Sequence, residues 1–118
     1  MFADTRRILA IDADVDTLAQ ITVALATRGF EVTAETSVDG GLSAARTHAF
    51  DLVVYGAGCD TVEAFVAQLK DIPVVLLSDP DLACPCAFAR VRRPLEPREL
   101  TRRVAGCLLL RRAPRLAA

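Results

Sequence analysis

Apolar and polar positions follow two different periods along this chain. Short apolar runs, rich in Val, Ile and Leu, are typical of parallel strands that are covered on both faces. One further run alternates between polar and apolar positions and contains β-branched residues, which also indicates a strand. We predict five strands, at residues 7–11, 30–34, 51–55, 73–78 and 88–92.

The segments between these strands carry apolar residues at helical spacing. Leu18, Ile21 and Leu25 repeat at intervals of three and four residues, and Gly29 follows where a helix end favours positive φ. Asp60 precedes the third such segment and is predicted to cap it. We predict four helices, at residues 14–28, 37–48, 61–70 and 97–112, the last of which begins with a proline.

Strands that alternate with helices predict an α/β domain with a parallel sheet and right-handed crossovers. In such a sheet, functional groups collect beyond the carboxyl ends of the strands. Here those ends carry residues 12–14, 56–58, 78–79 and 92–94. Candidate chemistry is therefore expected at these four places.

Composition predicts one folded domain. The chain has 118 residues, of which 53% are hydrophobic and 25% charged, so it has enough apolar surface to fold. No apolar run approaches the roughly 20 residues of a membrane span, and no leader-like apolar segment follows the N-terminus, so we expect a cytoplasmic location. We expect a single domain over residues 1–118, with its core at about 6–112.

Four cysteines occur, and only Cys84 and Cys86 lie close together in the sequence. Their spacing differs from that of redox and zinc motifs, and the single histidine, His48, is far from them. We therefore expect free thiols in a reducing compartment, with a strained or regulatory disulfide as the alternative.

Basic residues are concentrated in the second half of the chain, where residues 61–118 have a net charge of +4 against −5 for residues 1–60. A solvated helix face would explain this, but guanidinium groups also suit phosphates and guanine bases. DNA is not expected as a partner, since no helix-turn-helix segment follows and only 5% of the residues are aromatic. The candidate ligand or partner face consists of Arg90, Arg92, Arg93, Pro94, Arg98, Arg102 and Arg103.

Five stretches of the sequence, taken in order, resemble the receiver domain of bacterial two-component response regulators. They are Ile8–Asp12, Arg28–Val32, Phe50–Val54, Ile72–Ser78 and Arg93–Leu100. The resemblance implies a flavodoxin-like, doubly wound sheet of five parallel strands in the order 2-1-3-4-5. It also implies a role in two-component signalling, and a corner at Arg93–Pro94 that often has a cis peptide bond.

The receiver family transfers a phosphoryl group to an aspartate at the end of the third strand, with Mg²⁺ held by carboxylates after the first strand. In this sequence the acceptor position is Gly56, and Ala13 falls where a carboxylate for the metal is expected. Arg93 replaces the family's lysine, and Ser78 takes the position of the switch hydroxyl. The resemblance therefore implies a degenerate pocket with no catalytic residue and no Mg²⁺ or other cofactor, formed by Asp12, Ala13, Asp14, Gly56, Ser78 and Arg93.

The connection from Ser78 to Arg93 is shorter than in most receivers, and residues 79–86 contain two prolines. The fourth helix of the family is therefore expected to be short or missing. Because that helix covers one face of the sheet, we expect exposed apolar surface beside the fourth and fifth strands, which would mark a partner site.

Three hypotheses follow for this non-enzymatic module. In the first, it binds a histidine kinase, another receiver or a domain of its own parent chain through the side formed by the fourth and fifth strands and the last helix. Leu108–Leu110 on that helix favour either a wide buried stripe or a contact such as a homodimer. In the second, the arginine face binds an anionic nucleotide such as cyclic di-GMP. In the third, Asp60 or Asp51 acts as a displaced phosphoryl acceptor.

Overall fold

The computed structural model describes residues 6–69, 72–78 and 89–112. All five predicted strands and all four predicted helices are present in this part of the chain, with their ends displaced by a few residues. In chain order they are β1 (Arg7–Ile11), α1 (Val15–Ala26), β2 (Glu31–Glu35), α2 (Val38–Thr47), β3 (Leu52–Tyr55), α3 (Cys59–Ala67), β4 (Val74–Ser78), β5 (Ala89–Arg92) and α4 (Pro97–Arg112).

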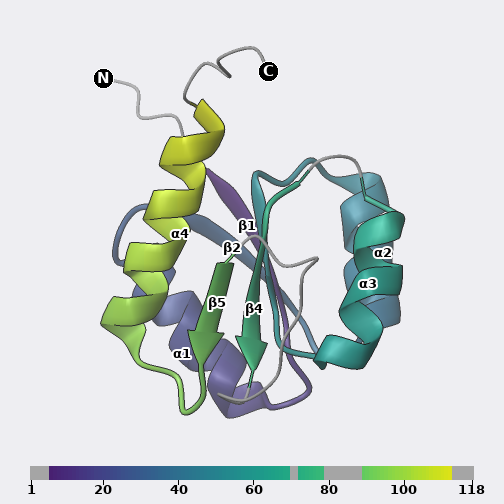
Figure 1. Cartoon of the computed structure of the whole chain (residues 1–118), viewed down its shortest axis with the longest axis horizontal. Helices are drawn as coiled ribbons and strands as arrows, with labels where there is room; N and C mark the ends of the chain where they lie inside the picture. Colours follow the sequence, from purple (N-terminus) through teal and green to yellow (C-terminus); the bar gives the residue numbers. More distant parts are fainter. Residues whose placement is uncertain (1–5, 70–71, 79–88, 113–118) are drawn as a thin grey trace.

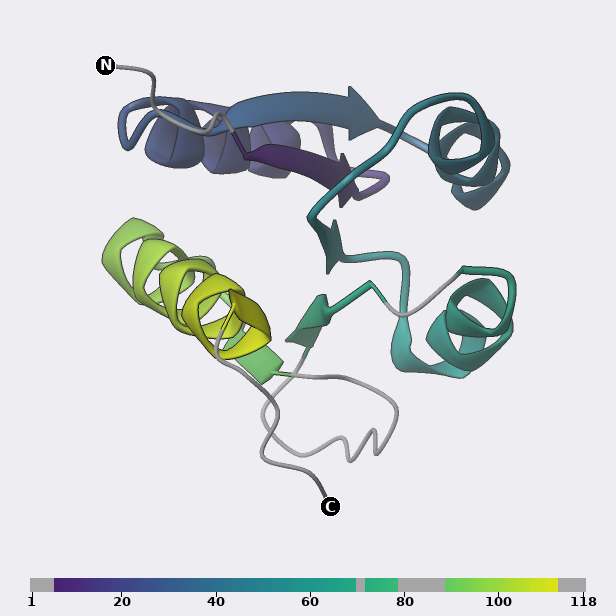
Figure 2. The ribbon, with the colours of Figure 1, turned by 90° about the horizontal axis from the view of Figure 1, so that it is seen from above.

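The strands form one parallel sheet in the order β2-β1-β3-β4-β5, which confirms the predicted topology. Helices α1 and α4 cover one face of the sheet, and α2 and α3 cover the other (Figures 1 and 2). Because all strands are parallel, their carboxyl ends lie at one edge, and β2 and β5 are the two outer strands. The residues predicted to carry chemistry are therefore gathered at that carboxyl edge.

Two apolar clusters fill the space between the sheet and its helices. Successive strand residues point to opposite faces, so Ile8 packs in the cluster under α1 and α4 whereas Leu9 packs in the cluster under α2 and α3. The helix stripe of Leu18, Ile21 and Leu25 is buried in the first cluster, as predicted. Burial on both faces explains why β1, β3 and β4 are almost wholly apolar.

The predicted start of the third helix was wrong. Helix α3 begins at Cys59, its N-cap is Gly58 with a φ of 112°, and no side chain caps it. Asp60 lies inside the first turn, where a carboxylate complements the helix dipole without acting as the cap. By contrast, Gly29 has the positive φ expected after α1, at 92°.

The prediction of exposed apolar surface on β4 and β5 was also wrong for these two strands. Every residue of β4 is buried. On β5, Val91 is buried against the cluster under α1 and α4, and the residues of its opposite face are Arg90 and Arg92. On the face where an exposed apolar patch was expected, β5 therefore presents charged side chains, and the apolar Val74 and Leu76 of β4 are buried.

The structure also bears on the predictions for the Arg93–Pro94 corner, the cysteines and membrane spans. The Arg93–Pro94 peptide bond is cis, as expected. Cys107 is a free, buried thiol whose pKa is raised by burial. No helix in the described ranges is long and apolar enough to cross a membrane. The predicted short fourth helix, and the pair Cys84 and Cys86, lie outside the described residues.

Two adjacent glycines of α2 provide a test of this packing. A methyl group at Gly41 would press on Ile11, with its Cβ only 2.8 Å from the Ile11 Cγ1 atom in the core, whereas at Gly40 it would meet the movable carboxylate of Glu35. We expect Gly41→Ala to lower the free energy of unfolding by about 1–3 kcal/mol. Gly40→Ala, the matched control, should leave stability unchanged or raise it by up to about 1 kcal/mol through helix propensity. Urea unfolding measures both, and equal effects would contradict this packing.

Candidate functional site

One guanidinium group joins the ends of two strands at the carboxyl edge. The Nη2 atom of Arg93 donates to Asp12 Oδ2 at 2.8 Å and to the carbonyl oxygen of Gly56 at 2.9 Å. The backbone N–H of Arg93 also donates to the carbonyl of Ser78, at the end of β4. Arg93 therefore links the carboxyl ends of β1, β3 and β4 to the end of β5.

Asp12 is almost completely buried, and both of its oxygens have partners. Oδ2 accepts from Arg93, and Oδ1 accepts from the backbone N–H of Asp14 at 2.8 Å. Only 4% of the Asp12 side chain is exposed, so its charge depends on these contacts rather than on water. The carboxylate that the receiver resemblance assigns to metal binding is used here to hold the protein together.

Gly56 has no room for a side chain. A Cβ atom at this position would overlap Oδ2 of Asp12 and lie 2.9 Å from Nη2 of Arg93. The space beside Gly56, the position that the receiver resemblance assigns to the phosphoryl acceptor, is therefore filled by the Asp12–Arg93 ion pair.

Asp14 and Ala13, which follow Asp12, do not provide free ligands for a metal ion. Asp14 caps α1: its side chain accepts from the N–H of Asp16 and from the hydroxyl of Thr17, and the latter bond is the main cause of its lowered pKa. Ala13 is exposed and offers no donor or acceptor on its side chain. The donor set does not fit Mg²⁺, because it supplies one carboxylate that already touches a cation.

Ser78 is placed at the same edge, but it does not join the network through its side chain. Its hydroxyl oxygen is buried and has no hydrogen-bond partner among the described residues. The structure thus brings Asp12, Gly56 and Arg93 into direct contact and places Ser78 beside them through its backbone alone.

Comparison with known proteins agrees with this architecture. The receiver domain of an HD domain-containing protein from Pseudomonas fluorescens Pf-5 superimposes with a TM-score of 0.80 at 18% identity, covering 93% of this chain and 91% of that one. A CheY-like receiver domain from Methanospirillum hungatei JF-1 gives 0.79 at 20% identity, with 91% and 96% covered. The chemotaxis response regulator CheY4 of Vibrio cholerae gives 0.75 at 19% identity, with 86% and 98% covered.

The chain has the fold of a response-regulator receiver domain. No family model matches its sequence, and no curated protein matches it either. In this fold the Asp12–Arg93 pair lies at the carboxyl edge of the sheet, beside the end of β3.

Among the described residues, neither alternative acceptor forms a hydrogen bond or an ion pair with Asp12 or Arg93. Asp51 lies just before β3, at the amino end, where it accepts from the N–H of Arg7 and contacts the guanidinium of Arg6. Asp60 is exposed in the first turn of α3, four residues beyond Gly56.

The predicted arginine face is brought together only in part. A surface hollow of 530 Å³ is lined by Arg90, Arg92, Pro94, Glu96, Glu99 and Arg103, and we call it the arginine hollow. Arg93 turns away from it to Asp12, and Arg98 and Arg102 do not line it. Glu96 and Glu99 were not predicted, although their place among the arginines of the last helix was visible in the sequence.

The two carboxylates of the arginine hollow, one just before α4 and one in its first turn, both accept hydrogen bonds from residues of α4. Glu96 accepts from the backbone N–H of Arg98 at 2.8 Å, which satisfies a free donor at the start of the helix. Glu99 accepts from Arg103 and from Arg102, and these bonds hold its pKa below the usual value. Among the described residues, Arg90 and Arg92 form no ion pair.

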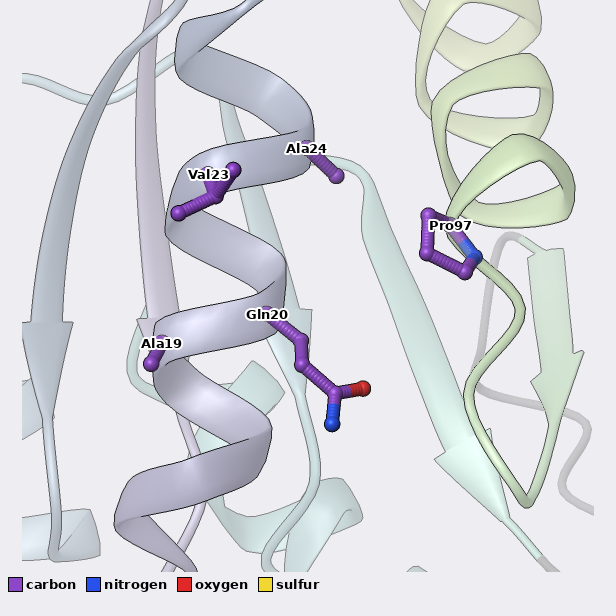
Figure 3. Close-up of a pocket in the computed structure, with 5 residues that line it drawn as sticks. All are labelled: Ala19, Gln20, Val23, Ala24 and Pro97. Carbon is purple, nitrogen blue, oxygen red and sulfur yellow. The ribbon is translucent and has the colours of Figure 1, made fainter.

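A second hollow, of 360 Å³, was missed by the sequence analysis. It lies between α1 and the start of α4, where Gln20 and Ala24 point toward Pro97 (Figure 3). Val23, which also lines it, is 67% exposed. Val15, Ala19 and Val23 repeat every four residues on the outer side of α1, and that spacing could have revealed an apolar stripe in addition to the buried one.

The Arg93 network can be tested by its effect on stability. Arg93→Met leaves the buried Asp12 carboxylate with the Asp14 N–H as its remaining hydrogen-bond donor, so we expect about 1–3 kcal/mol of destabilisation. Adding Asp12→Asn should recover part of this loss, giving a coupling energy of about 1 kcal/mol in a double-mutant cycle. Urea unfolding at neutral pH is the measurement.

Arg98→Met is the matched control for this cycle. Arg98 is exposed and its side chain forms no ion pair among the described residues, so its loss should change stability by less than about 0.5 kcal/mol. If Arg93→Met were as mild as Arg98→Met, the network would have no structural role.

Proposed function

We propose that this chain is a pseudo-receiver: a non-phosphorylatable regulatory module of two-component signalling that acts by protein–protein interaction. Its contact surface is the side formed by β4, β5 and α4. The partner is a histidine kinase, another receiver or a domain of the parent chain. The observation that carries the proposal is the Asp12–Arg93 pair, which fills the acceptor position at Gly56.

A phosphoryl acceptor needs a free carboxylate that can approach the donor together with a metal ion. Here glycine stands at that position, and the nearest carboxylate is buried with both oxygens engaged. Recognition is what such a domain can still do, since binding needs only a surface. We propose that no Mg²⁺ cofactor takes part.

The choice of surface follows from charge and exposure. Of the two outer strands, β5 carries two arginines that have no ion pair in the described part of the chain. The neighbouring helix α4 adds Leu109, which is 71% exposed, whereas Leu108 beside it is buried. Exposed apolar and cationic side chains together are typical of protein interfaces.

Treatment with acetyl phosphate and Mg²⁺, followed by intact mass measurement, tests the loss of phosphorylation. We expect no added phosphoryl mass on the unmodified chain. The Gly56→Asp variant should not gain a phosphoryl group either. Ala13 leaves the metal ion one carboxylate short, and the new aspartate side chain must displace Asp12. A stable phosphoryl adduct on the unmodified chain would instead support Asp51, Asp60 or another residue as acceptor.

Photo-cross-linking in cells tests the contact surface. A photoreactive residue placed at Arg98 on α4 should give a discrete cross-linked product. The same residue at the exposed Asp39 on α2, on the other face of the sheet, should not. Equal products from both positions, or products from α2 alone, would contradict the proposed side.

A second candidate function is supported by the arginine hollow. Its volume of 530 Å³ is in the range of small-ligand pockets, and guanidinium groups from β5 and α4 converge on it. We propose as the alternative that it binds an anionic nucleotide such as cyclic di-GMP, with Arg90, Arg92 and Arg103 contacting the phosphates or stacking on the bases.

Calorimetric titration with cyclic di-GMP tests this alternative. A sensor should release or absorb measurable heat, and the doubly substituted Arg90→Ala, Arg92→Ala protein should bind at least about tenfold more weakly. The Arg28→Ala protein, which loses the same charge near the opposite edge of the sheet, is the control. An absence of binding at high micromolar ligand would remove the sensor hypothesis.

A further inference from the structure

The outer edge of β5 combines backbone groups that no described residue pairs with and a regular pattern of charge. Strand β5 is the last strand of the sheet and pairs with β4. Within the described part of the chain, no backbone hydrogen bond reaches its other side. An unpaired strand edge is a template for another extended segment.

The orientation of these backbone groups follows from one hydrogen bond. The N–H of Arg93 donates to the carbonyl of Ser78, so it points toward β4. Backbone groups of consecutive residues in a parallel strand point alternately to its two sides. The N–H and C=O groups of Arg90 and Arg92 therefore point away from β4, toward the open edge.

The arginine hollow runs along this edge. Arg90 and Arg92 share one face of the sheet, because they are two residues apart, and Val91 between them is buried on the opposite face under α4. Glu99 and Arg103 reach the hollow from α4, on that opposite face. Because the arginine hollow is lined from both faces of β5, it extends around the outer edge of this strand.

The charges have the spacing of an extended chain. Alternate residues of a strand are about 6.6 Å apart, and cross-strand neighbours on one face lie opposite one another. Acidic residues at alternate positions of an added strand would therefore meet Arg90 and Arg92 in turn. These two guanidinium groups form no ion pair with the described residues, so an incoming carboxylate would displace no partner among those residues.

We infer that β5 binds an extended acidic segment of a partner protein, with acidic residues at alternate positions, by strand addition at its outer edge. This inference rests on the proposed function and specifies the chemistry of the partner. Glu99 weakens the binding of such a segment. Its carboxylate lines the hollow, where it repels acidic side chains, and it already forms an ion pair with Arg103.

Fluorescence anisotropy with labelled synthetic peptides tests the inference on the full chain. The probe is a short peptide in which Asp alternates with Val. One control peptide has the same composition with all Asp residues consecutive, and a second has the alternating sequence with N-methyl groups on alternate amides. We expect the alternating peptide to bind, the consecutive one to bind several-fold more weakly, and the N-methylated one not to bind.

Protein variants locate the binding. Arg90→Ala and Arg92→Ala should each weaken binding by about two- to fivefold, as expected for one cross-strand charge pair. Arg28→Ala removes the same charge near the far edge of the sheet and should leave affinity unchanged. Glu99→Gln should strengthen binding by about twofold, because it frees Arg103. This gain cannot come from a misfolded protein.

Several results would overturn strand addition. They are equal binding of the alternating and consecutive peptides, undiminished binding of the N-methylated peptide, or equal losses in the Arg28 and Arg92 variants. If no peptide binds while cross-links still form at Arg98, the proposed interaction surface stands and strand addition is wrong. If those cross-links are absent as well, the proposed function fails with it.

Discussion

The Asp12–Arg93 ion pair is the constraint on which the carboxyl edge of this sheet depends. Parallel strands need long connections, so the residues that meet at one edge are far apart in the sequence. Asp12 and Arg93 are separated by 81 positions, yet their 2.8 Å contact, together with the bond to the Gly56 carbonyl, joins the first, third and fifth strands. Removing the Arg93 guanidinium would leave the buried Asp12 carboxylate half-satisfied, whereas the Arg93 side chain is 32% exposed and would keep its bond to the Gly56 carbonyl if Asp12 were replaced.

This constraint also explains how the chain uses its charge. In a phosphorylated receiver, the carboxyl edge must keep carboxylates available for a metal ion. Here the buried carboxylate is neutralised internally, and the neighbouring Asp14 is engaged in capping α1. By contrast, Arg90 and Arg92 on the outer strand β5 form no ion pair with the described residues. Their guanidinium groups can therefore contact another molecule.

Much of the fold could be predicted because it depends on short-range patterns. Short apolar runs such as Leu52–Tyr55 favour strands buried on two faces, because they are too short for a typical helix and alternate with helix-period segments. The stripe of Leu18, Ile21 and Leu25 likewise defined the buried side of α1. The glycine with positive φ that follows α1, Gly29, was equally visible in the sequence. By contrast, the cap of α3 was assigned wrongly because Asp60 suits both a cap and a first turn, and pattern alone does not separate the two.

The candidate site could be predicted only as a set of positions. The sequence indicates that Asp12, Gly56 and Arg93 lie at one edge of the sheet. It does not indicate that the Arg93 side chain contacts Asp12 and does not line the hollow with the other arginines. That choice depends on side-chain geometry across three strands. The arginine hollow likewise depends on Glu99 of α4 lying opposite β5, a relation between elements that helical periodicity does not contain.

The sheet divides the interior into two apolar clusters that share only its backbone. Helix α4 shares its cluster with α1 and not with α2 or α3. Leu100 and Val104 of α4 share that cluster with Ile21 and Leu25 of α1, so the two helices form one close-packed layer. The apolar hollow lined by Val23 and Pro97 lies between these same two helices, on the side of the sheet away from α2 and α3.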